Sequence, residues 1–456
     1  MTGENKEEII YRRDEQRAAG KTLREQVPLE AHAEWQPRPD RRDPVDILEE
    51  SSQGRVPELV PIRYGRMLAN PFAFLRGSAA LMAYDLATTP VSGIRVQACG
   101  DCHLANFGLF ATPERNLVFD LNDFDETLPA PWEWDIKRLA ASFVVAGRAN
   151  GFSKKINDGI VQTLAQSYRT HLRDYADMRV LDVWYSRLDD KTLIAAAPNE
   201  EAREYRRQVA AKARASVTEY LFPKITGLVD GHRRIVDKLP LVYHLPTQDG
   251  AEARILKLLE GYQQTLPDHL CKLFEHYHYE DLAFKVVGVG SVGTRCYIVL
   301  FMADNDDPLL LQVKEARSSV MEAYAGKSKF DHHGQRVVVG QRIMQSASDM
   351  FLGWLTAGDG KHYFVRQLRD MKFSIPLEGI KAGGLTRYAA ICGWVLARAH
   401  AKGGDAALIS GYLGKKDTFD IALSQFAEAY ADQTEKDHQR LAETVKSGKV
   451  QAKSDL

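Results

Sequence analysis

The pattern of apolar and polar positions first changes near residue 60. Residues 1–60 are rich in charge and proline and hold only short apolar patches, so we predict a partly ordered N-terminal arm. After Pro71, FAFLRGSAALMAYDLA is typical of an apolar helix, and GIRVQACGD of a short buried strand. Apolar residues recur at helical spacing from Trp132 to Gly147, which predicts a core helix. Charged stretches over about residues 154–237 indicate further helices.

A second change near Leu282 begins a β-rich region. The segment FKVVGVGSVGTRCYIVLFMA predicts an apolar strand, a glycine turn and a second strand, and PLLLQVKEA predicts a third. A helix around His333 to Gln345 and two strands, Met350 to Leu355 and His362 to Leu368, complete a small α+β lobe. Helices return after Gly384. The predicted divisions are an N-terminal arm (1–60), a helical lobe (61–270), a β-rich nucleotide-binding lobe (271–370), returning helices (371–435) and a charged tail (436–456).

Length and charge limit the functional classes. A chain of 456 residues predicts about two to four domains or lobes, and 45% hydrophobic with 27% charged residues is ordinary for a globular protein. The formal net charge of −1 does not favour a nucleic-acid or membrane-surface partner. The N-terminus lacks the apolar core of a signal peptide, and no run of about 18 apolar residues occurs. We therefore expect a cytoplasmic protein.

The five cysteines form a poor disulfide framework, because their number is odd and most are scattered. They are predicted to be reduced thiols. Cys99 and Cys102 form a CxxC next to His103, so a zinc site or a redox site is an alternative. Both are less favoured, because a second ligand pair is missing and a redox CxxC normally opens a helix after a strand.

Acidic and amide side chains gather in CGDCHLANF and in LNDFDE, each near a predicted strand. Asp101 precedes Asn106 by five residues, the spacing at which a phosphotransferase loop orients a hydroxyl with its aspartate and holds Mg²⁺ with its asparagine. Asp123 supplies the further carboxylate that a DFG-type loop uses for magnesium. Asp and Asn are also common in turns and caps. Asp120 and Asp125 are expected to tune or cap the loop, and Asp125 replaces the glycine of DFG.

A glycine-rich sequence, Gly288-Val-Gly290-Ser291-Val-Gly293, follows much later in the chain. Such a GxGxxG alone could indicate a dinucleotide fold, but that loop would open into a helix, whereas TRCYIVLF is β-branched and aromatic. We therefore predict a hairpin whose backbone amides cover nucleotide phosphates. Lys314 ends the next strand, where its ammonium could reach the α- and β-phosphates.

Two further assignments depend on chain order. The glutamate partner of Lys314 is predicted to be Glu322, with Glu315 behind it, although the helix 335–345 contains no glutamate. The segment around Gln367 is predicted to be the hinge whose backbone receives the adenine.

GDCHLANF resembles the G-D-x-H-x-x-N loop of the aminoglycoside phosphotransferase and choline kinase branch of the protein-kinase-like superfamily, and NDF resembles its I-D-F. WDIKRL resembles the helix start after the metal loop, which implies that Asp135 supports the catalytic loop. His103 is implied to pack this loop without binding metal. VLARAHA (395–401) resembles the end of the helix that precedes the catalytic loop. Most of residues 55–435 is similar to the bacterial family catalogued as domain of unknown function twenty-two fifty-two.

The resemblance implies an α+β, two-lobe, protein-kinase-like fold in circularly permuted order, because the catalytic loop precedes the glycine hairpin. Surface termini tolerate such a rearrangement. We expect an enzyme, an ATP- and Mg²⁺-dependent phosphotransferase that acts on a hydroxyl of a small molecule. The alternatives are nucleotidyl transfer to protein, nucleotide binding without turnover, and a metal-dependent phosphoester hydrolase that uses the acids and His103 of these loops. The sequence names neither the acceptor nor an oligomeric state.

Overall fold

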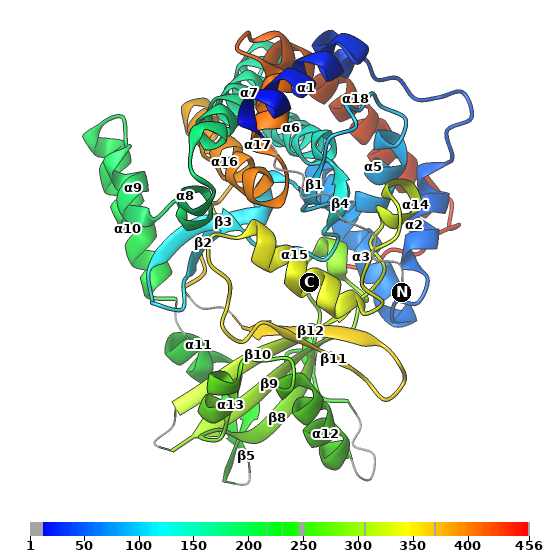
Figure 1. The fold of residues 1–456 in the computed structure, drawn as a ribbon. Helices are drawn as coiled ribbons and strands as arrows, with labels where there is room; N and C mark the ends of the chain where they lie inside the picture. Colours follow the sequence, from blue (N-terminus) through cyan, green and yellow to red (C-terminus); the bar gives the residue numbers. More distant parts are fainter. Residues whose placement is uncertain are drawn as a thin grey trace, which may run out of the picture.

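The computed structural model describes residues 12–216, 218–229, 231–245, 251–304, 307–368 and 371–454. It is an α+β protein with a helical lobe above a sheet lobe (Figure 1). The helices are α1 Arg13–Gln26, α2 Pro44–Ser52, α3 Val60–Met67, α4 Pro71–Gly77, α5 Ala79–Leu86, α6 Trp132–Ala149, α7 Lys154–Asp177, α8 Val180–Tyr185, α9 Asp190–Ala195, α10 Glu200–Arg214, α11 Thr218–Ile225, α12 Ala251–Gln263, α13 Asp268–Phe274, α14 Glu322–Ala325, α15 His333–Met344, α16 Ala382–Gly403, α17 Ala406–Leu413 and α18 Thr418–Lys446. The strands are β1 Arg95–Ala98, β2 Phe107–Ala111, β3 Leu117–Leu121, β4 Leu128–Pro131, β5 Thr226–Val229, β6 His232–Ile235, β7 Val242–Tyr243, β8 His278–Lys285, β9 Cys296–Ala303, β10 Asp307–Ala316, β11 Gly353–Thr356 and β12 His362–Gln367. Short 3-10 turns are η1 Leu29–Ala33, η2 Pro57–Leu59, η3 Leu104–Asn106 and η4 Val289–Ser291.

The sheet lobe contains one antiparallel sheet in the order β11-β12-β10-β9-β8-β7. Its central strand β10 is buried at nearly every position, as its apolar run predicts. Helices α12 and α13 cover one face, where Tyr262 packs on Phe274 and Phe274 packs on Phe301. Helix α15 lies between the sheet and the helical lobe (Figure 1). The predicted hairpin, the helix near 333–345 and the strand near 362–368 are confirmed, and the strand predicted for 350–355 begins three residues later.

The helical lobe packs around α6, which is buried along almost its whole length. The core helix predicted for residues 132–147 is therefore confirmed. Trp132 at its start is fully buried and stacks on Tyr168 of α7, with ring centroids 5.7 Å apart. Helices α16 and α18 pack on α7, so the segments before and after the sheet lobe form one core.

The described residues of the predicted N-terminal arm, 12–60, form helices and turns that pack on the helical lobe. Helix α1 packs on α17, where a Cβ on Gly20 would lie 2.2 Å from the Leu408 carbonyl oxygen. Arg41 is buried between two carboxylates, donating to Asp85 at 2.8 Å and to Asp437 at 2.7 Å. The composition of this segment did not reveal its packing, because the contacts are made with residues that are distant in the sequence. Residues 1–11 of the predicted arm lie outside the described residues.

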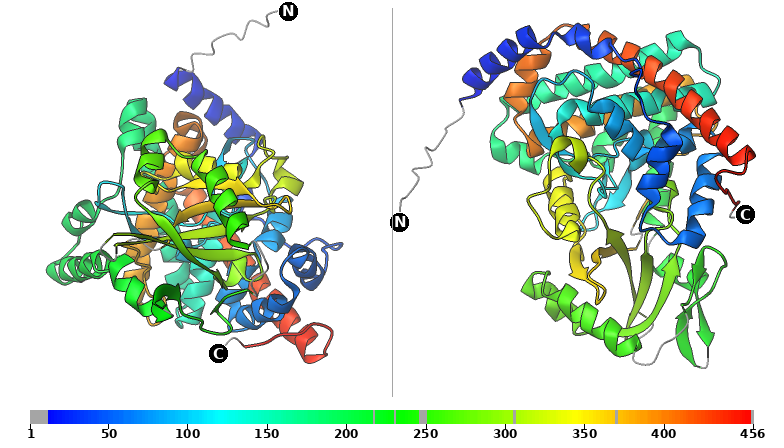
Figure 2. Two further views of the ribbon diagram at one scale, coloured as in Figure 1. Left: turned by 90° about the horizontal axis from the view of Figure 1, so that it is seen from below. Right: turned by 90° about the vertical axis from the view of Figure 1, so that its right-hand side faces the viewer.

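Three other boundaries differ from the prediction. The apolar helix expected after Pro71 is divided into α4 and α5, because Ser78 has a non-helical ψ of 37°. The segment 154–237 is not entirely helical, since β5 and β6 form a hairpin within it. The tail predicted from residue 436 begins inside α18, and the Lys453 N–H donates to the Pro61 carbonyl oxygen at 2.9 Å. Figure 2 shows this red C-terminal segment beside the blue N-terminal helices. Residues 455 and 456 lie outside the described residues.

None of the described helices has the length and the apolar character that crossing a membrane requires.

Candidate active site

A cavity of about 1180 Å³ lies between the two lobes. Its walls come from the loops after β1 and β3, the glycine loop between β8 and β9, and strands β10 and β12. The residues predicted for the site that line it are Asp101, His103, Asn106, Asp123, Asp125, Gly288, Gly290, Ser291, Lys314 and Gln367. The structure therefore brings the early acidic loops and the late glycine hairpin to one cleft.

The loop after β1 requires a glycine at position 100. Gly100 has a φ of +82°, and a Cβ there would lie 2.5 Å from the Glu126 carbonyl oxygen. Asp135 on α6 accepts hydrogen bonds from the N–H groups of Cys99 at 2.6 Å and Gly100 at 2.9 Å. His400 of α16 lies 3.3 Å from the same carboxylate. Asp135 thus fixes the backbone of the loop and does not line the cavity.

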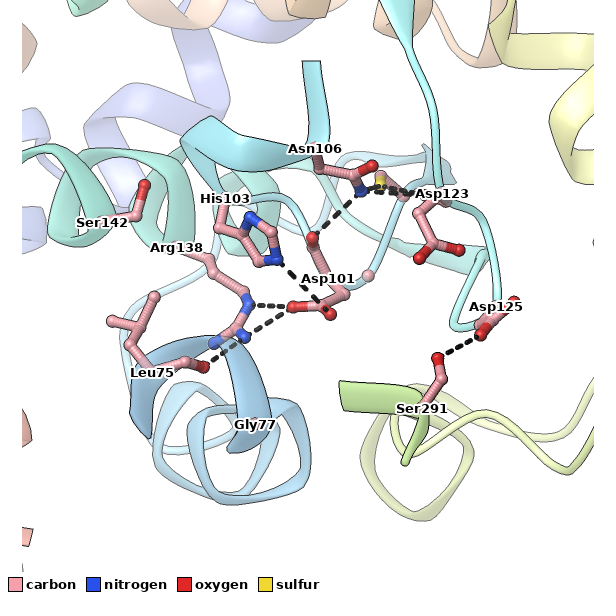
Figure 3. Close-up of polar contacts among 12 residues, drawn as sticks. Leu75, Gly77, Asp101, His103, Asn106, Asp123, Asp125, Arg138, Ser142 and Ser291 are labelled. Carbon is pink, nitrogen blue, oxygen red and sulfur yellow. Dashed lines mark hydrogen bonds and ion pairs between the residues drawn. The ribbon is translucent and has the colours of Figure 1, made fainter. Parts of the chain in front are cut away.

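Asp101 extends from this loop into the cleft, with 24% of its side chain exposed (Figure 3). Arg138 of α6 donates to its Oδ1 from Nε at 2.8 Å and from Nη2 at 2.5 Å, and also donates to the Leu75 carbonyl oxygen. His103 Nε2 lies 3.9 Å from Oδ2. Burial lowers the pKa of His103 to about 4 despite the attraction of Asp101, so its ring is neutral at pH 7. Arg138 was not singled out from the sequence, although it lies within the WDIKRL match.

Asn106 connects the two acidic loops. Its Nδ2 donates to the backbone carbonyl oxygens of Asp101 at 3.3 Å and Asp123 at 2.9 Å (Figure 3). Its Oδ1 and the Asp123 Oδ1 are buried and accept no hydrogen bond in the described part of the chain. Amide and carboxylate oxygens that accept no hydrogen bond can bind a metal ion, and Mg²⁺ prefers oxygen ligands, so these two residues fit that ion.

Lys314 places a buried positive charge beside the acidic loop after β3. Its ammonium is almost fully buried, pairs closely with Asp125 Oδ2 and lies 3.7 Å from Asp123 Oδ1. Burial alone raises the pKa of an aspartate. For Asp123 the charges of Lys314, Arg366 and Lys372 outweigh burial and lower the pKa to about 2. The pKa of Asp125 is raised by burial and by the neighbouring charge of Asp123.

The partner predicted for Lys314 is corrected by this geometry. Glu322 accepts from the Ser319 N–H at 3.3 Å, within its own helix cap, and Glu315 pairs with Arg295 at 3.2 Å. Among the described residues, the carboxylates within ion-pair distance of Lys314 are those of Asp123 and Asp125. Both carboxylates belong to the acidic loop after β3, and helix α15 contains no glutamate.

Helix α15 contributes an arginine to the site instead. Arg336 donates to the backbone carbonyl oxygens of Thr127 at 2.6 Å and Asp125 at 2.7 Å. At the other end of the helix, Gln345 donates to the Leu121 carbonyl oxygen at 2.7 Å. The helix thereby holds both ends of the acidic loop that carries Asp123.

The tip of the glycine loop rests on the two acidic loops. Ser291 Oγ donates to Asp125 Oδ2 at 3.2 Å (Figure 3). A Cβ on Gly290 would lie 3.1 Å from the Arg76 carbonyl oxygen and 3.8 Å from Asp101 Oδ2. Only a residue without a side chain allows this close approach without displacing its neighbours.

Sequence comparison places these features in one family. Residues 55–444 match the family described as "Uncharacterized protein conserved in bacteria (DUF2252)". The chain belongs to this family. No curated protein and no solved structure matched it.

The first residues of the segment that matches DUF2252 form hydrogen bonds to the end of the glycine loop. Arg55 donates to the Val292 carbonyl oxygen at 2.6 Å, and the Val56 N–H donates to the Gly293 carbonyl oxygen at 2.7 Å. Gly293 has a φ of +85°, which favours glycine. These contacts join segments that are far apart in sequence, and no local pattern in the sequence predicted them.

The hinge assignment meets a specific obstacle. Gln367 borders the cavity, but its backbone N–H already donates to the Asp349 carboxylate. The next N–H, of Leu368, donates to the Leu310 carbonyl oxygen at 2.8 Å. Neither N–H is available to an adenine in this conformation.

The residues considered for the alternative metal sites lie in buried or hydrogen-bonded surroundings. Cys99 and Cys102 are fully buried free thiols, and burial raises the pKa of Cys102 well above its usual range, which disfavours the thiolate. Asp120 points away from the cleft, accepting from Arg398 at 2.6 Å and from the Ser346 N–H at 2.8 Å. Across the described ranges, no group of three or more His, Cys, Asp or Glu residues is arranged to hold a metal ion.

Proposed function

We propose that this protein is an ATP- and Mg²⁺-dependent phosphotransferase with a protein-kinase-like fold in circularly permuted order, acting on a hydroxyl of a small molecule. The observation that carries the proposal is the meeting of three features in one cleft. Ser291 of the glycine hairpin and Lys314 of the next strand both contact Asp125, beside the Asp101 and Asp123 loops. A glycine-rich hairpin, a strand lysine and two aspartate loops are the parts from which kinases assemble their site.

The end of α16 supports the permuted order. In an unpermuted chain, the helix ending in RAHA would lead directly into the catalytic loop. Here a Cβ on Gly403 would lie 2.8 Å from the Gln97 Cβ, and one on Gly404 would lie 2.6 Å from the Val96 Cγ1. The end of α16 therefore lies against β1, the strand that leads to Asp101, although the two segments are far apart in the sequence.

The roles follow from the contacts. Asp101, fixed by Arg138, would orient the acceptor hydroxyl and receive its proton. Lys314 and the amides of the glycine loop would hold the phosphates. Asn106 and Asp123 would hold Mg²⁺, which when bound supplies positive charge that neutralises the phosphate oxygens.

The size of the cleft fits two ligands. Its volume of about 1180 Å³ exceeds the roughly 300–1,000 Å³ of a typical small-molecule site. A nucleotide would therefore leave space for a small acceptor beside Asp101.

The test is thermal unfolding with ATP, with and without Mg²⁺, on the wild type and on Asp123→Asn. Ligand at about 100 times its Kd stabilises the native state by about 2.7 kcal/mol, so the wild type should unfold at a higher temperature when ATP and Mg²⁺ are both present. Asp123→Asn should lose most of the magnesium-dependent part, whereas Asp182→Asn on the exposed helix α8 should keep it. A wild type that shows no magnesium-dependent shift would overturn the proposal. ATP labelled at the γ- or the α-phosphate then separates phosphoryl from nucleotidyl transfer.

A further inference from the structure

Arg76, at the end of α4, has a guanidinium without an anionic partner at the edge of the cleft. In the part of the chain that the structure describes, it forms no ion pair, and its Nε is buried and donates no hydrogen bond. Its Cζ lies 6.0 Å from the centre of the Phe72 ring. Burial lowers its pKa, and the nearby charges of Asp101 and Asp123 oppose that effect. Arg76 is half-buried, and withdrawing part of a guanidinium from water without an anionic partner is costly, so its position beside the cavity suggests that it binds an anion.

The other arginines that line the cavity near these loops are engaged. Arg55 donates to a carbonyl oxygen of the glycine loop, and Arg366 donates to Gln312 at 2.9 Å and to the Asn122 carbonyl oxygen at 3.2 Å. Arg138, behind the cavity wall, is committed to Asp101. These contacts fix loops and strands, whereas the guanidinium N–H groups of Arg76 donate no hydrogen bond to the described residues.

Arg76 also lies where a terminal phosphate would be. A Cβ on Gly288 would lie 4.0 Å from its Nη2, so the guanidinium is beside the start of the glycine loop. Its own carbonyl oxygen lies against Gly290 at the loop tip. The charges of Asp101 and Asp123 are near enough to raise its pKa. The guanidinium therefore lies near both the loop that would cover the phosphates and the aspartates that would orient the acceptor and the metal.

We propose that Arg76 binds the terminal phosphoryl group of a nucleoside triphosphate and makes the site select triphosphates over diphosphates. This inference rests on the proposed phosphotransferase function. In the transfer, the bond between the γ-phosphorus and the β,γ-bridging oxygen breaks, and its electron pair leaves with the nucleoside diphosphate. A bond forms from the acceptor oxygen to phosphorus, and the hydroxyl proton passes to Asp101. The planar guanidinium can donate two hydrogen bonds to oxygens of the moving group, which carry its negative charge throughout.

The experiment is titration calorimetry of the whole chain with ATP and with ADP, both with Mg²⁺. Hydrogen bonds from a charged donor are strong enough that Arg76→Ala should weaken ATP binding about tenfold or more, while ADP binding changes less than about twofold. Arg76→Lys should lie between the wild type and Arg76→Ala, because it keeps the charge and loses the paired donors. Arg179→Ala, at the exposed position before the first residue of α8, should match the wild type for both nucleotides.

Several outcomes would contradict the inference. If Arg76→Ala weakens the binding of ATP and ADP equally, or weakens the binding of neither, Arg76 does not bind the terminal phosphate. If circular dichroism shows that Arg76→Ala is unfolded, the Arg76→Lys ratio of ATP to ADP affinity decides, and an unchanged ratio overturns the inference. A wild type that binds neither nucleotide refutes the phosphotransferase itself, which distinguishes that failure from a failure confined to Arg76.

Discussion

Replacing Lys314 by Met removes the positive charge at the centre of the candidate site and keeps a side chain of similar length. The Lys314 side chain is 4% exposed and pairs with Asp125 and Asp123, so the substitution leaves two carboxylates without their nearest cation. Removing one member of a fully buried ion pair costs about 3–5 kcal/mol. The cost here should be lower, because 46% of the Asp123 side chain and 25% of the Asp125 side chain are open to the cleft.

The pKa of Asp123 allows the size of the effect to be worked out. The decrease from 3.8 to about 2 is the net result of burial and of several cations, of which Lys314 has the largest effect. It corresponds to about 2.4 kcal/mol, and screening by water at this half-open carboxylate reduces the share of Lys314 to about 1–2 kcal/mol. With a smaller contribution from Asp125, we expect Lys314→Met to lower the free energy of unfolding by about 2 kcal/mol at pH 7. A group with a lowered folded-state pKa stabilises the protein above its unfolded pKa, and this stabilisation disappears as the pH falls through the folded value. The difference from the wild type should therefore shrink between about pH 4 and pH 2.

The measurement is urea unfolding of the wild type and Lys314→Met at pH 7 and pH 3. The double variant Lys314→Met with Asp125→Asn should recover part of the lost stability, because it removes one unpaired carboxylate. Lys361→Met is the matched control, since Lys361 pairs with Asp359 at the surface and should change stability by less than about 0.5 kcal/mol. An equal loss at both pH values, or a double variant whose losses simply add, would refute the electrostatic explanation and leave lost packing as the cause.

Two glycines give further predictions, each with a control glycine. Gly290→Val should weaken ATP binding in calorimetry at least about tenfold with little change in melting temperature, because its side chain would displace the loop tip from the Arg76 carbonyl oxygen. Gly288→Ala should bind ATP almost normally, since its Cβ meets only an arginine side chain at 4.0 Å, and equal effects of the two variants would contradict this explanation. Gly100→Ala should lower the free energy of unfolding by about 2–4 kcal/mol, because it combines a φ of +82° with a backbone contact of 2.5 Å. Gly93 has a similar φ of +84°, and no atom lies within 4 Å of the position of its Cβ. Gly93→Ala should therefore lower the free energy of unfolding by only about 1 kcal/mol in the same urea assay. A loss as large as that of Gly100→Ala would show that the backbone contact is unimportant.

Much of the secondary structure was predictable because its signals are local. The helical spacing from Trp132, the glycine turn before TRCYIVLF and the apolar run of β10 each depend on neighbouring residues. The residue types around Asp101 and Asp123 were equally visible, since a loop motif is written in consecutive positions. Their role in phosphoryl transfer remains a proposal.

Contacts between distant segments were not predictable in this way. The sequence pointed to Glu322 as the partner of Lys314, whereas the structure pairs Lys314 with Asp125, because the path of the chain places the acidic loop under β10. It predicted a partly ordered arm for residues 1–60, and no local pattern showed that Arg41 of that segment is buried between two carboxylates of the helical lobe.

The sequence by itself determined the family, the main helices and strands, and the chemical types of the candidate residues, because these depend on short patterns that a linear chain displays. Only the tertiary structure decided which charges lie together: Arg138 pairs with Asp101, Lys314 pairs with Asp125, and Arg76 lines the cleft without an ion pair to any of the described residues. The physical reason is that the strength of an electrostatic contact depends on distance and burial in space, and separation along the chain specifies neither.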